Sequence, residues 1–208
     1  MAAYDGEAAT YDDGAYPVPL HRSFVRRLAE TCPPYGVILD APCGTGQYFP
    51  IVRETGRRVL GVDQSAGMLA QARARGLAEA LEQVALQALT YVAAFDGAMS
   101  VDALENVPPE DWPLVLANLH RALRPEGHLY FTVEEIDQAE IDAAFAEADR
   151  QGIPAVHGEV IEGDTAGYHY YPGRDRVMSW LGSEGLIVVD EAVSEHEGWA
   201  YRHFLVRS

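Results

Sequence analysis

Short apolar runs alternate with amphipathic stretches along this chain, a pattern typical of β-strands that alternate with α-helices. Two of the apolar runs, residues 37–39 and 59–62, have the length of buried strands, and each ends at an acidic residue, Asp40 or Asp63. The alternation predicts an α/β fold with a largely parallel sheet. Helices are expected at 20–31, 47–55, 66–75, 111–123, around 141–148 and around 177–181, and strands at 37–40, 58–63, 84–86, 95–101, 128–133, 186–189 and 199–206.

The last two apolar segments differ from the others because no helix separates them. In the final segment Tyr201 and His203 alternate with Arg202 and Phe204, the two-residue period of a strand with two different faces. We therefore expect an antiparallel hairpin at the edge of the sheet. A Ser65 N-cap and a Gly76 C-cap support the helix predicted between them.

The residues that follow the first strand indicate a small-molecule site. Asp40 leads into a loop in which Gly44 and Gly46 let the backbone pass close to a ligand. Asp63 stands at the tip of the second strand, where a carboxylate can accept hydrogen bonds from both hydroxyls of a ribose. Together these residues predict an adenosine-type site.

The same loop argues against two common nucleotides. Counted from Gly44, the position of the third glycine in the dinucleotide fingerprint is occupied by Phe49, which disfavours NAD. The phosphate loop of ATP- and GTP-binding proteins needs a lysine, and all 15 basic residues of this chain are arginine.

Composition narrows the functional class further. The 208 residues suffice for one α/β domain, and 48% of them are hydrophobic. A net charge of −17 argues against nucleic-acid and membrane partners, because phosphate binding depends largely on Arg and Lys. Cys32 and Cys43 fit neither a disulfide framework nor a zinc site, and we expect no metal. A cytoplasmic protein, monomeric or homodimeric, is the expectation.

These motifs together resemble the class I S-adenosylmethionine-dependent methyltransferases. The resemblance covers residues 35–135 in order: the glycine loop after the first strand, Val62-Asp63 with a helix start at the second, residues 95–100, and residues 119–131. Pro42 stands where glycine is common in that family. Because proline has a fixed negative φ and no backbone N–H, this position neither needs a positive φ nor donates a hydrogen bond to the ligand. The resemblance implies a three-layer Rossmann-like sandwich with a seven-stranded, mostly parallel sheet, in a single domain of residues 1–208.

The resemblance also implies S-adenosylmethionine as cofactor and a set of residues that hold it. An acidic, Tyr-rich N-terminal arm, residues 1–19, would fold over the cofactor, and the amino end of the helix at 47–55 would face its methionyl carboxylate. The residues expected around the cofactor are Tyr11, Asp40, Ala41, Gly44, Gly46, Asp63, Gln64, Met68, Gln87, Ala88, Ser100 and Val101.

Fewer sequence features indicate the methyl acceptor. Residues 136–172 form a long connection at the rim of the site, which we interpret as a lid or as a fixed cap that shields the cofactor. His169 is the candidate proton acceptor, with Asp102 as a second catalytic candidate. Acidic and aromatic side chains at this rim favour a small neutral or cationic acceptor. The expected acceptor contacts are Asn106, Glu134, Tyr168, Tyr171 and Trp199.

The leading hypothesis is therefore methyl transfer from S-adenosylmethionine to an O or N atom of a small molecule. Such a displacement needs alignment more than dedicated chemistry, so a catalytic motif can be absent. The alternative is a non-catalytic module that binds S-adenosylmethionine for regulation or assembly.

Overall fold

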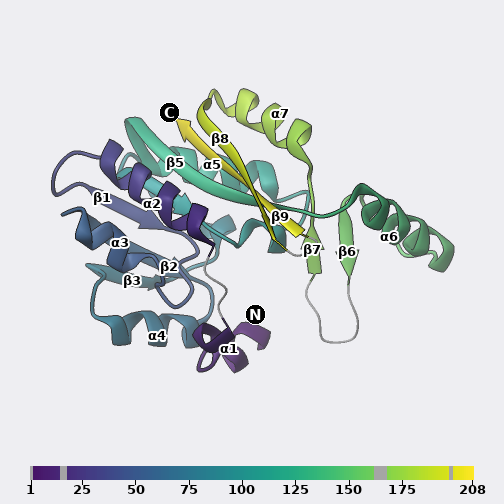
Figure 1. The fold of residues 1–208 in the computed structure, drawn as a ribbon, viewed down its shortest axis with the longest axis horizontal. Helices are drawn as coiled ribbons and strands as arrows, with labels where there is room; N and C mark the ends of the chain where they lie inside the picture. Colours follow the sequence, from purple (N-terminus) through teal and green to yellow (C-terminus); the bar gives the residue numbers. More distant parts are fainter. Residues whose placement is uncertain (1, 15–17, 162–167, 197–198) are drawn as a thin grey trace.

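A seven-stranded sheet forms the centre of the protein (Figure 1). The computed structural model describes residues 2–14, 18–161, 168–196 and 199–208. The strand order is β3-β2-β1-β4-β5-β9-β8, and β9 runs antiparallel to both of its neighbours. This confirms the seven-stranded, mostly parallel sheet with its antiparallel C-terminal pair. The strands are β1 (Val37–Asp40), β2 (Arg58–Asp63), β3 (Ala80–Gln83), β4 (Phe95–Ser100), β5 (Leu123–Glu135), β8 (Ile187–His196) and β9 (Trp199–Arg207).

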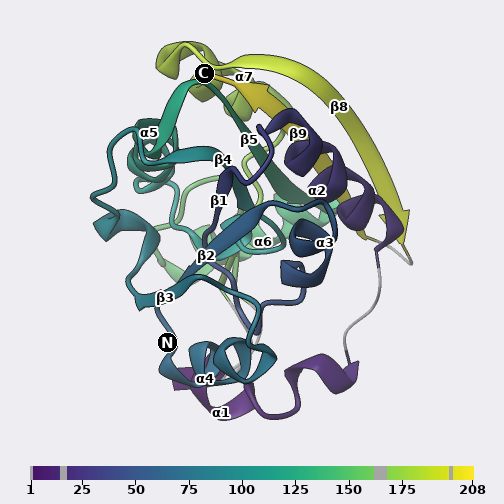
Figure 2. The same ribbon diagram turned by 90° about the vertical axis from the view of Figure 1, so that its left-hand side faces the viewer.

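Helices cover both faces of the sheet and give the three layers of a Rossmann-like sandwich (Figure 2). On one face, Phe24 and Leu28 of α2 pack with Phe49 and Val52 of α3 and with Leu69 of α4. On the other face, α5 and α7 pack against the sheet and each other. The helices are α1 (Ala2–Glu7), α2 (Pro19–Thr31), α3 (Phe49–Glu54), α4 (Ala66–Arg75), α5 (Trp112–Ala122), α6 (Gln138–Gln151) and α7 (Arg174–Glu184).

The predicted caps of α4 are confirmed. The Ser65 hydroxyl accepts a hydrogen bond from the Met68 N–H at 3.1 Å, and Gly76 adopts the left-handed conformation with φ of 65°. These two residues satisfy backbone groups that a helix leaves without partners at its ends. The cap fixes where α4 begins, directly after Asp63.

The third strand lies earlier than predicted. It spans Ala80–Gln83, whereas the apolar residues Val84 and Leu86 follow it in a loop and a short 3-10 helix, η2 (Leu86–Ala88). An edge strand with mostly exposed side chains carries no apolar run, so the hydrophobic signal came from residues that line a cavity instead.

The connection after β5 contains structure that the sequence did not predict. A separate two-stranded sheet, β6 (Glu159–Ile161) and β7 (Tyr168–Tyr170), lies beside α6 at one end of the molecule (Figure 1). Tyr170 is fully buried against Trp112 of α5, whereas Phe145 of α6 is exposed. Residues 162–167 of the expected lid, and residues 15–17 of the expected arm, lie outside the described part of the chain.

No helix in the described part of the chain combines the length and the apolar character that a membrane span requires.

Candidate cofactor and acceptor site

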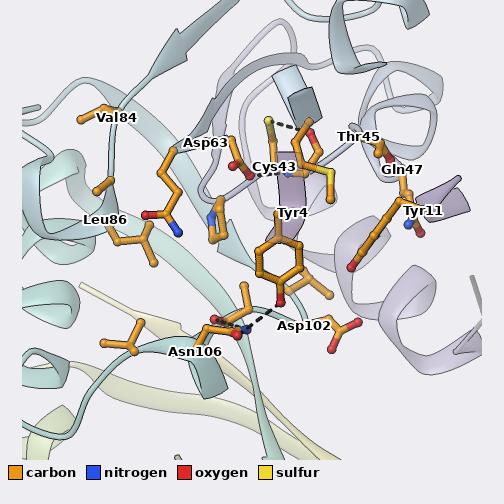
Figure 3. Close-up of a pocket in the computed structure, with 18 of the residues that line it drawn as sticks. Tyr4, Tyr11, Cys43, Thr45, Gln47, Asp63, Val84, Leu86, Asp102 and Asn106 are labelled. Carbon is orange, nitrogen blue, oxygen red and sulfur yellow. Dashed lines mark hydrogen bonds between the residues drawn. The ribbon is translucent and has the colours of Figure 1, made fainter. Parts of the chain in front are cut away.

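A cavity opens at the edge of the sheet where the parallel strands β1, β2 and β4 end. Asp40, Asp63 and Ser100 are the last residues of these strands. Open parallel sheets bind their ligands in the crevice at this edge. Figure 3 shows Asp63 toward one end of the cavity, Asp102 and Asn106 toward the other, and the ring of Tyr4 between them.

The glycine loop gives the cavity its floor. Gly44 has φ of 52°, and a Cβ added there meets no atom within 4 Å, so it would project into open space. Gly46 has φ of 78°, and a Cβ there would lie 2.5 Å from the Phe49 ring. Gly44 therefore keeps the cavity open, whereas Gly46 allows close packing of the loop on α3.

Asp63 connects the glycine loop to the start of α4 through hydrogen bonds. Its carboxylate accepts a hydrogen bond from the Gly44 N–H at 2.9 Å and another from the Ser65 N–H at 2.8 Å. The side chain is only 7% exposed, and burial raises its pKa above the ordinary value although both N–H donors oppose this. Since a carboxylate has about four acceptor positions, capacity remains for a ligand.

The N-terminal arm closes one side of the cavity. Tyr4 and Tyr11 line it, and the Tyr4 hydroxyl donates to Asn106 Oδ1 at 3.2 Å (Figure 3). Asp5 accepts hydrogen bonds at the amino end of α4, from the Gly67 N–H at 3.0 Å among others. Asp12 accepts from the Thr45 hydroxyl at 2.7 Å. The arm is thus attached to the glycine loop, to α4 and to the loop after β4.

A group of ionisable residues surrounds the end of the cavity opposite Asp63. Asp102 lies there with a left-handed backbone, φ of 54°, and its side chain accepts a hydrogen bond from the Tyr201 hydroxyl. Asp102 lines the cavity, and burial raises its pKa. Glu105, buried nearby, has its pKa raised by burial and by the negative charges of Asp102 and Glu134.

Most of the predicted cofactor residues line this cavity. The structure brings together Tyr11, Gly44, Asp63, Gln64, Met68, Gln87 and Val101, and with them the acceptor-side residues Asp102 and Asn106.

The other predicted cofactor residues lie behind the wall of the cavity or beside it. Asp40, Ala41 and Ser100 are buried at the strand ends and do not line the cavity. Burial and then the Asp63 charge raise the pKa of Asp40 well above its ordinary value. Gly46 packs on Phe49, and Ala88 is exposed on η2. Their expected contact with a cofactor stays a prediction.

The remaining predicted acceptor residues lie outside the cavity lining. His169 lies on β7, where its Nδ1 is 3.0 Å from the Tyr171 hydroxyl and 3.5 Å from Glu134 Oε2. Tyr171 is buried, and the Tyr168 hydroxyl donates to Glu159. Trp199 begins β9, and its side chain lies outside the described part of the structure.

Several lining residues were missed from sequence. Tyr4 contacts Asn106 across 102 positions of the chain, and no local pattern marks such a contact. Tyr48 directly follows the glycine loop, and an aromatic residue there was an available signal. The other lining residues that the sequence did not predict are Pro42, Cys43, Thr45, Gln47, Val84, Ala85, Leu86, Ala103 and Val107.

Comparison with known proteins agrees with this geometry. Residues 39–131 match a family of methyltransferase domains. A malonyl-[acyl-carrier protein] O-methyltransferase from Serratia marcescens is 34% identical over 135 residues, which cover 63% of this chain and 51% of that protein. A trans-aconitate 2-methyltransferase from Deinococcus radiodurans is 40% identical over 99 residues, which cover 46% of this chain and 37% of that protein.

Solved structures share the fold over nearly the whole chain. A SAM-dependent methyltransferase from Methanosarcina mazei has a TM-score of 0.72 at 18% identity, covering 93% of this chain and 98% of the other. Residues 39–131 thus match a methyltransferase domain, and the fold around them is that of solved S-adenosylmethionine-dependent methyltransferases. A Burkholderia thailandensis 1,6-didemethyltoxoflavin-N1-methyltransferase, solved with bound S-adenosylhomocysteine, has a TM-score of 0.66 at 20% identity. The match covers 100% of this chain and 88% of that protein's chain.

S-adenosylmethionine is the cofactor of this class, and the cavity of this methyltransferase domain fits it. Asp63 retains acceptor capacity where an adenosine ribose is expected, and the space at Gly44 is open to a ligand. The described residues that line the cavity include no Arg or Lys, so they lack the cations that a polyphosphate needs. Among the described residues no His, Cys, Asp and Glu group is arranged to hold a metal.

The matched relatives are longer than this chain, which spans about half the length of the Serratia protein and 62% of a Bacillus subtilis relative.

Proposed function

We propose that the protein transfers the methyl group of S-adenosylmethionine to an oxygen or nitrogen atom of a small molecule. The observation that carries the proposal is the arrangement of one continuous cavity, with the ribose candidate Asp63 toward one end and the polar groups of Asp102 and Asn106 toward the other. The bound cofactor supplies an electrophilic methyl group on a positively charged sulfur.

The residues of this chain contribute mainly by alignment, which can supply about 7–11 kcal/mol of the barrier to a two-substrate reaction. Asp63 and the glycine loop hold the adenosine part, and Tyr4 and Tyr11 exclude water from that side. Asp102 lies where an acceptor is expected to enter and can accept a proton there, and burial raises its pKa. His169 stays a second candidate, acting from β7 beside Glu134.

The substrates for which the two relatives are named differ from each other. The Serratia relative is named for malonyl-[acyl-carrier protein] and the Deinococcus relative for trans-aconitate. The similarity therefore supports methyl transfer and leaves the acceptor to be argued from this chain's own residues. A cytoplasmic monomer or homodimer acting on a free metabolite remains part of the proposal.

Release of S-adenosylhomocysteine tests the proposal. Purified protein with S-adenosylmethionine and pools of metabolites should release it with at least one pool, and Gly44→Val should abolish the release. The alternative, a non-catalytic binding module, predicts tight binding of S-adenosylmethionine without release from any pool. A protein that binds neither S-adenosylmethionine nor S-adenosylhomocysteine would refute both.

A further inference from the structure

The end of the cavity opposite Asp63 collects negative charge from three separate elements. Asp102 follows β4, Glu105 belongs to the 3-10 helix η3 (Leu104–Asn106), and Glu134 lies near the end of β5. Asp102 accepts a hydrogen bond from the Tyr201 hydroxyl, and Tyr201 pairs with Glu134 between β9 and β5, so the two carboxyl groups lie on neighbouring residues of one cluster. The negative charges of both act on Glu105. The fold brings these residues to one end of the cavity although Asp102 and Glu134 are far apart in sequence.

Glu105 gives an independent sign that this end is built for a ligand. Its side chain is 6% exposed, and one oxygen accepts from the Asn106 amide at 2.7 Å. The other oxygen, Oε2, is buried with no hydrogen-bond partner among the described residues. A buried polar atom without a partner is costly, and native proteins rarely keep one without a functional reason.

The position of Glu105 places this unpartnered oxygen among the groups around the cavity. Its charge contributes to the raised pKa values of Tyr4, Tyr11 and Tyr201, although burial is the larger cause for each. These tyrosines come from the N-terminal arm and from β9, on different sides of the site. Glu105 accepts a hydrogen bond from Asn106, which lines the cavity together with Asp102, so Glu105 lies behind the lining and not in it.

The groups that face these carboxyls offer little positive charge. Among the residues that the structure describes, no Arg or Lys lines the cavity. His169 lies 3.5 Å from Glu134 through its Nδ1, which also lies 3.0 Å from the Tyr171 hydroxyl. The rings of Tyr4, Tyr11 and Tyr48 line the cavity, and aromatic faces attract cations.

We propose that Asp102, Glu105 and Glu134 form an acceptor subsite that selects an amine, bound as its ammonium ion. This inference rests on the proposed methyl transfer and specifies its acceptor. Asp102 contacts the ammonium group. The positive charge of the bound ammonium opposes the burial that raises the pKa of Glu105, so that Glu105 and Glu134 supply negative charge from behind it when the amine is bound. A carboxylate or phosphate acceptor would instead enter a field of its own sign.

The same arrangement suits the chemistry of N-methylation. The ammonium transfers one proton to the Asp102 carboxylate, so that an N–H bond breaks, an O–H bond forms and nitrogen keeps the electron pair. The amine nitrogen then bonds to the methyl carbon as the carbon–sulfur bond breaks, and that bond's electron pair stays on sulfur. Positive charge moves from sulfur to nitrogen, where the neighbouring carboxylates stabilise it. Asp102 later returns its proton to solvent.

A competing explanation is that the carboxyls serve the positive sulfur of the cofactor. Glu105→Gln distinguishes a role in acceptor binding from a role in cofactor binding, because glutamine keeps the size of the side chain and the oxygen that accepts from Asn106. Glu30→Gln, a substitution of an exposed residue on α2, is the matched control. Binding of S-adenosylmethionine, which has the charged sulfur, is compared with binding of S-adenosylhomocysteine, which lacks it.

The acceptor test compares amines of graded size. Each amine is compared with an alcohol and a carboxylate of similar carbon skeleton, for example phenethylamine with phenethyl alcohol and hydrocinnamate. Binding to the S-adenosylhomocysteine complex is measured by calorimetry, and turnover by release of S-adenosylhomocysteine. We expect the amines to bind and react in preference to their partners. Glu105→Gln should raise the KM for the amine at least about fivefold with the affinity for both cofactor forms unchanged, and Glu30→Gln should change neither.

Three results would overturn the inference. These are preference for the alcohols or carboxylates, absence of binding by every amine, and a Glu105→Gln effect confined to S-adenosylmethionine affinity. Binding of amines without turnover would support the subsite and count against the proposed methyl transfer, so the two failures are distinguishable.

Discussion

Replacing Asp63 by alanine tests how the cofactor is held. The carboxylate fixes the Gly44 and Ser65 N–H groups at 2.9 and 2.8 Å and has capacity left for ribose hydroxyls. Loss of charge-assisted hydrogen bonds to a ligand costs about 1.5–3 kcal/mol, which corresponds to roughly 10- to 150-fold in affinity. The two backbone donors also lose their partner, which should lower the free energy of unfolding by about 1–3 kcal/mol.

Two measurements keep these effects apart. Calorimetric titration with S-adenosylhomocysteine gives the loss of affinity, and urea unfolding without ligand gives the loss of stability. Asp63→Asn retains an acceptor oxygen for one backbone donor and should be less harmful in both, whereas Asp175→Asn, at an exposed position on α7, should match the parent. Affinity of Asp63→Ala within about twofold of the parent would remove Asp63 from the cofactor site.

Four further predictions concern other parts of the molecule. Gly44→Val should weaken cofactor binding more than Asp63→Ala, because its side chain enters the open space of the cavity at a φ unsuited to a β-branched residue; titration giving a smaller loss than Asp63→Ala would contradict this. Burial lowers the pKa of His21 to about 3 and of His203 to about 4 from 6.5, so the folded state binds fewer protons than the unfolded state between pH 4 and 6.5. Stability should therefore fall by about 1.4 kcal/mol per pH unit for each histidine as pH drops through this window, and urea titrations of His203→Gln should show that contribution removed; an unchanged slope would refute it. Hydrogen exchange should show residues 152–161 gaining protection when S-adenosylhomocysteine and acceptor bind, and equal protection in both states would make this segment a fixed cap. His169→Asn should lower turnover at least about tenfold with cofactor affinity unchanged, and full activity would assign the proton transfer elsewhere.

The order of strands and helices could be predicted because its signals are local. The apolar run ending at Asp63 and the Ser65 and Gly76 caps of α4 lie where the structure has them. The glycine loop was identifiable because positive φ values, 52° at Gly44 and 78° at Gly46, favour glycine.

The parts that sequence reasoning missed depend on distant contacts or on very short elements. The strands β6 and β7 have three residues each, and their polar Tyr and His side chains give no alternation that marks a strand. Tyr170 belongs to the core only because Trp112 lies against it. Likewise, Glu105 acquires its significance from Asp102 and Glu134, which tertiary structure brings near it.

The central claim, that the cavity at the carboxyl ends of β1, β2 and β4 binds S-adenosylmethionine, is tested most directly by calorimetry on the parent and on Gly44→Val. The account predicts that S-adenosylmethionine and S-adenosylhomocysteine bind the parent with one molecule per chain, that Gly44→Val loses both, and that NAD and ATP give no binding heat. Equal binding of either cofactor form by Gly44→Val, or a preference for NAD or ATP, would contradict it.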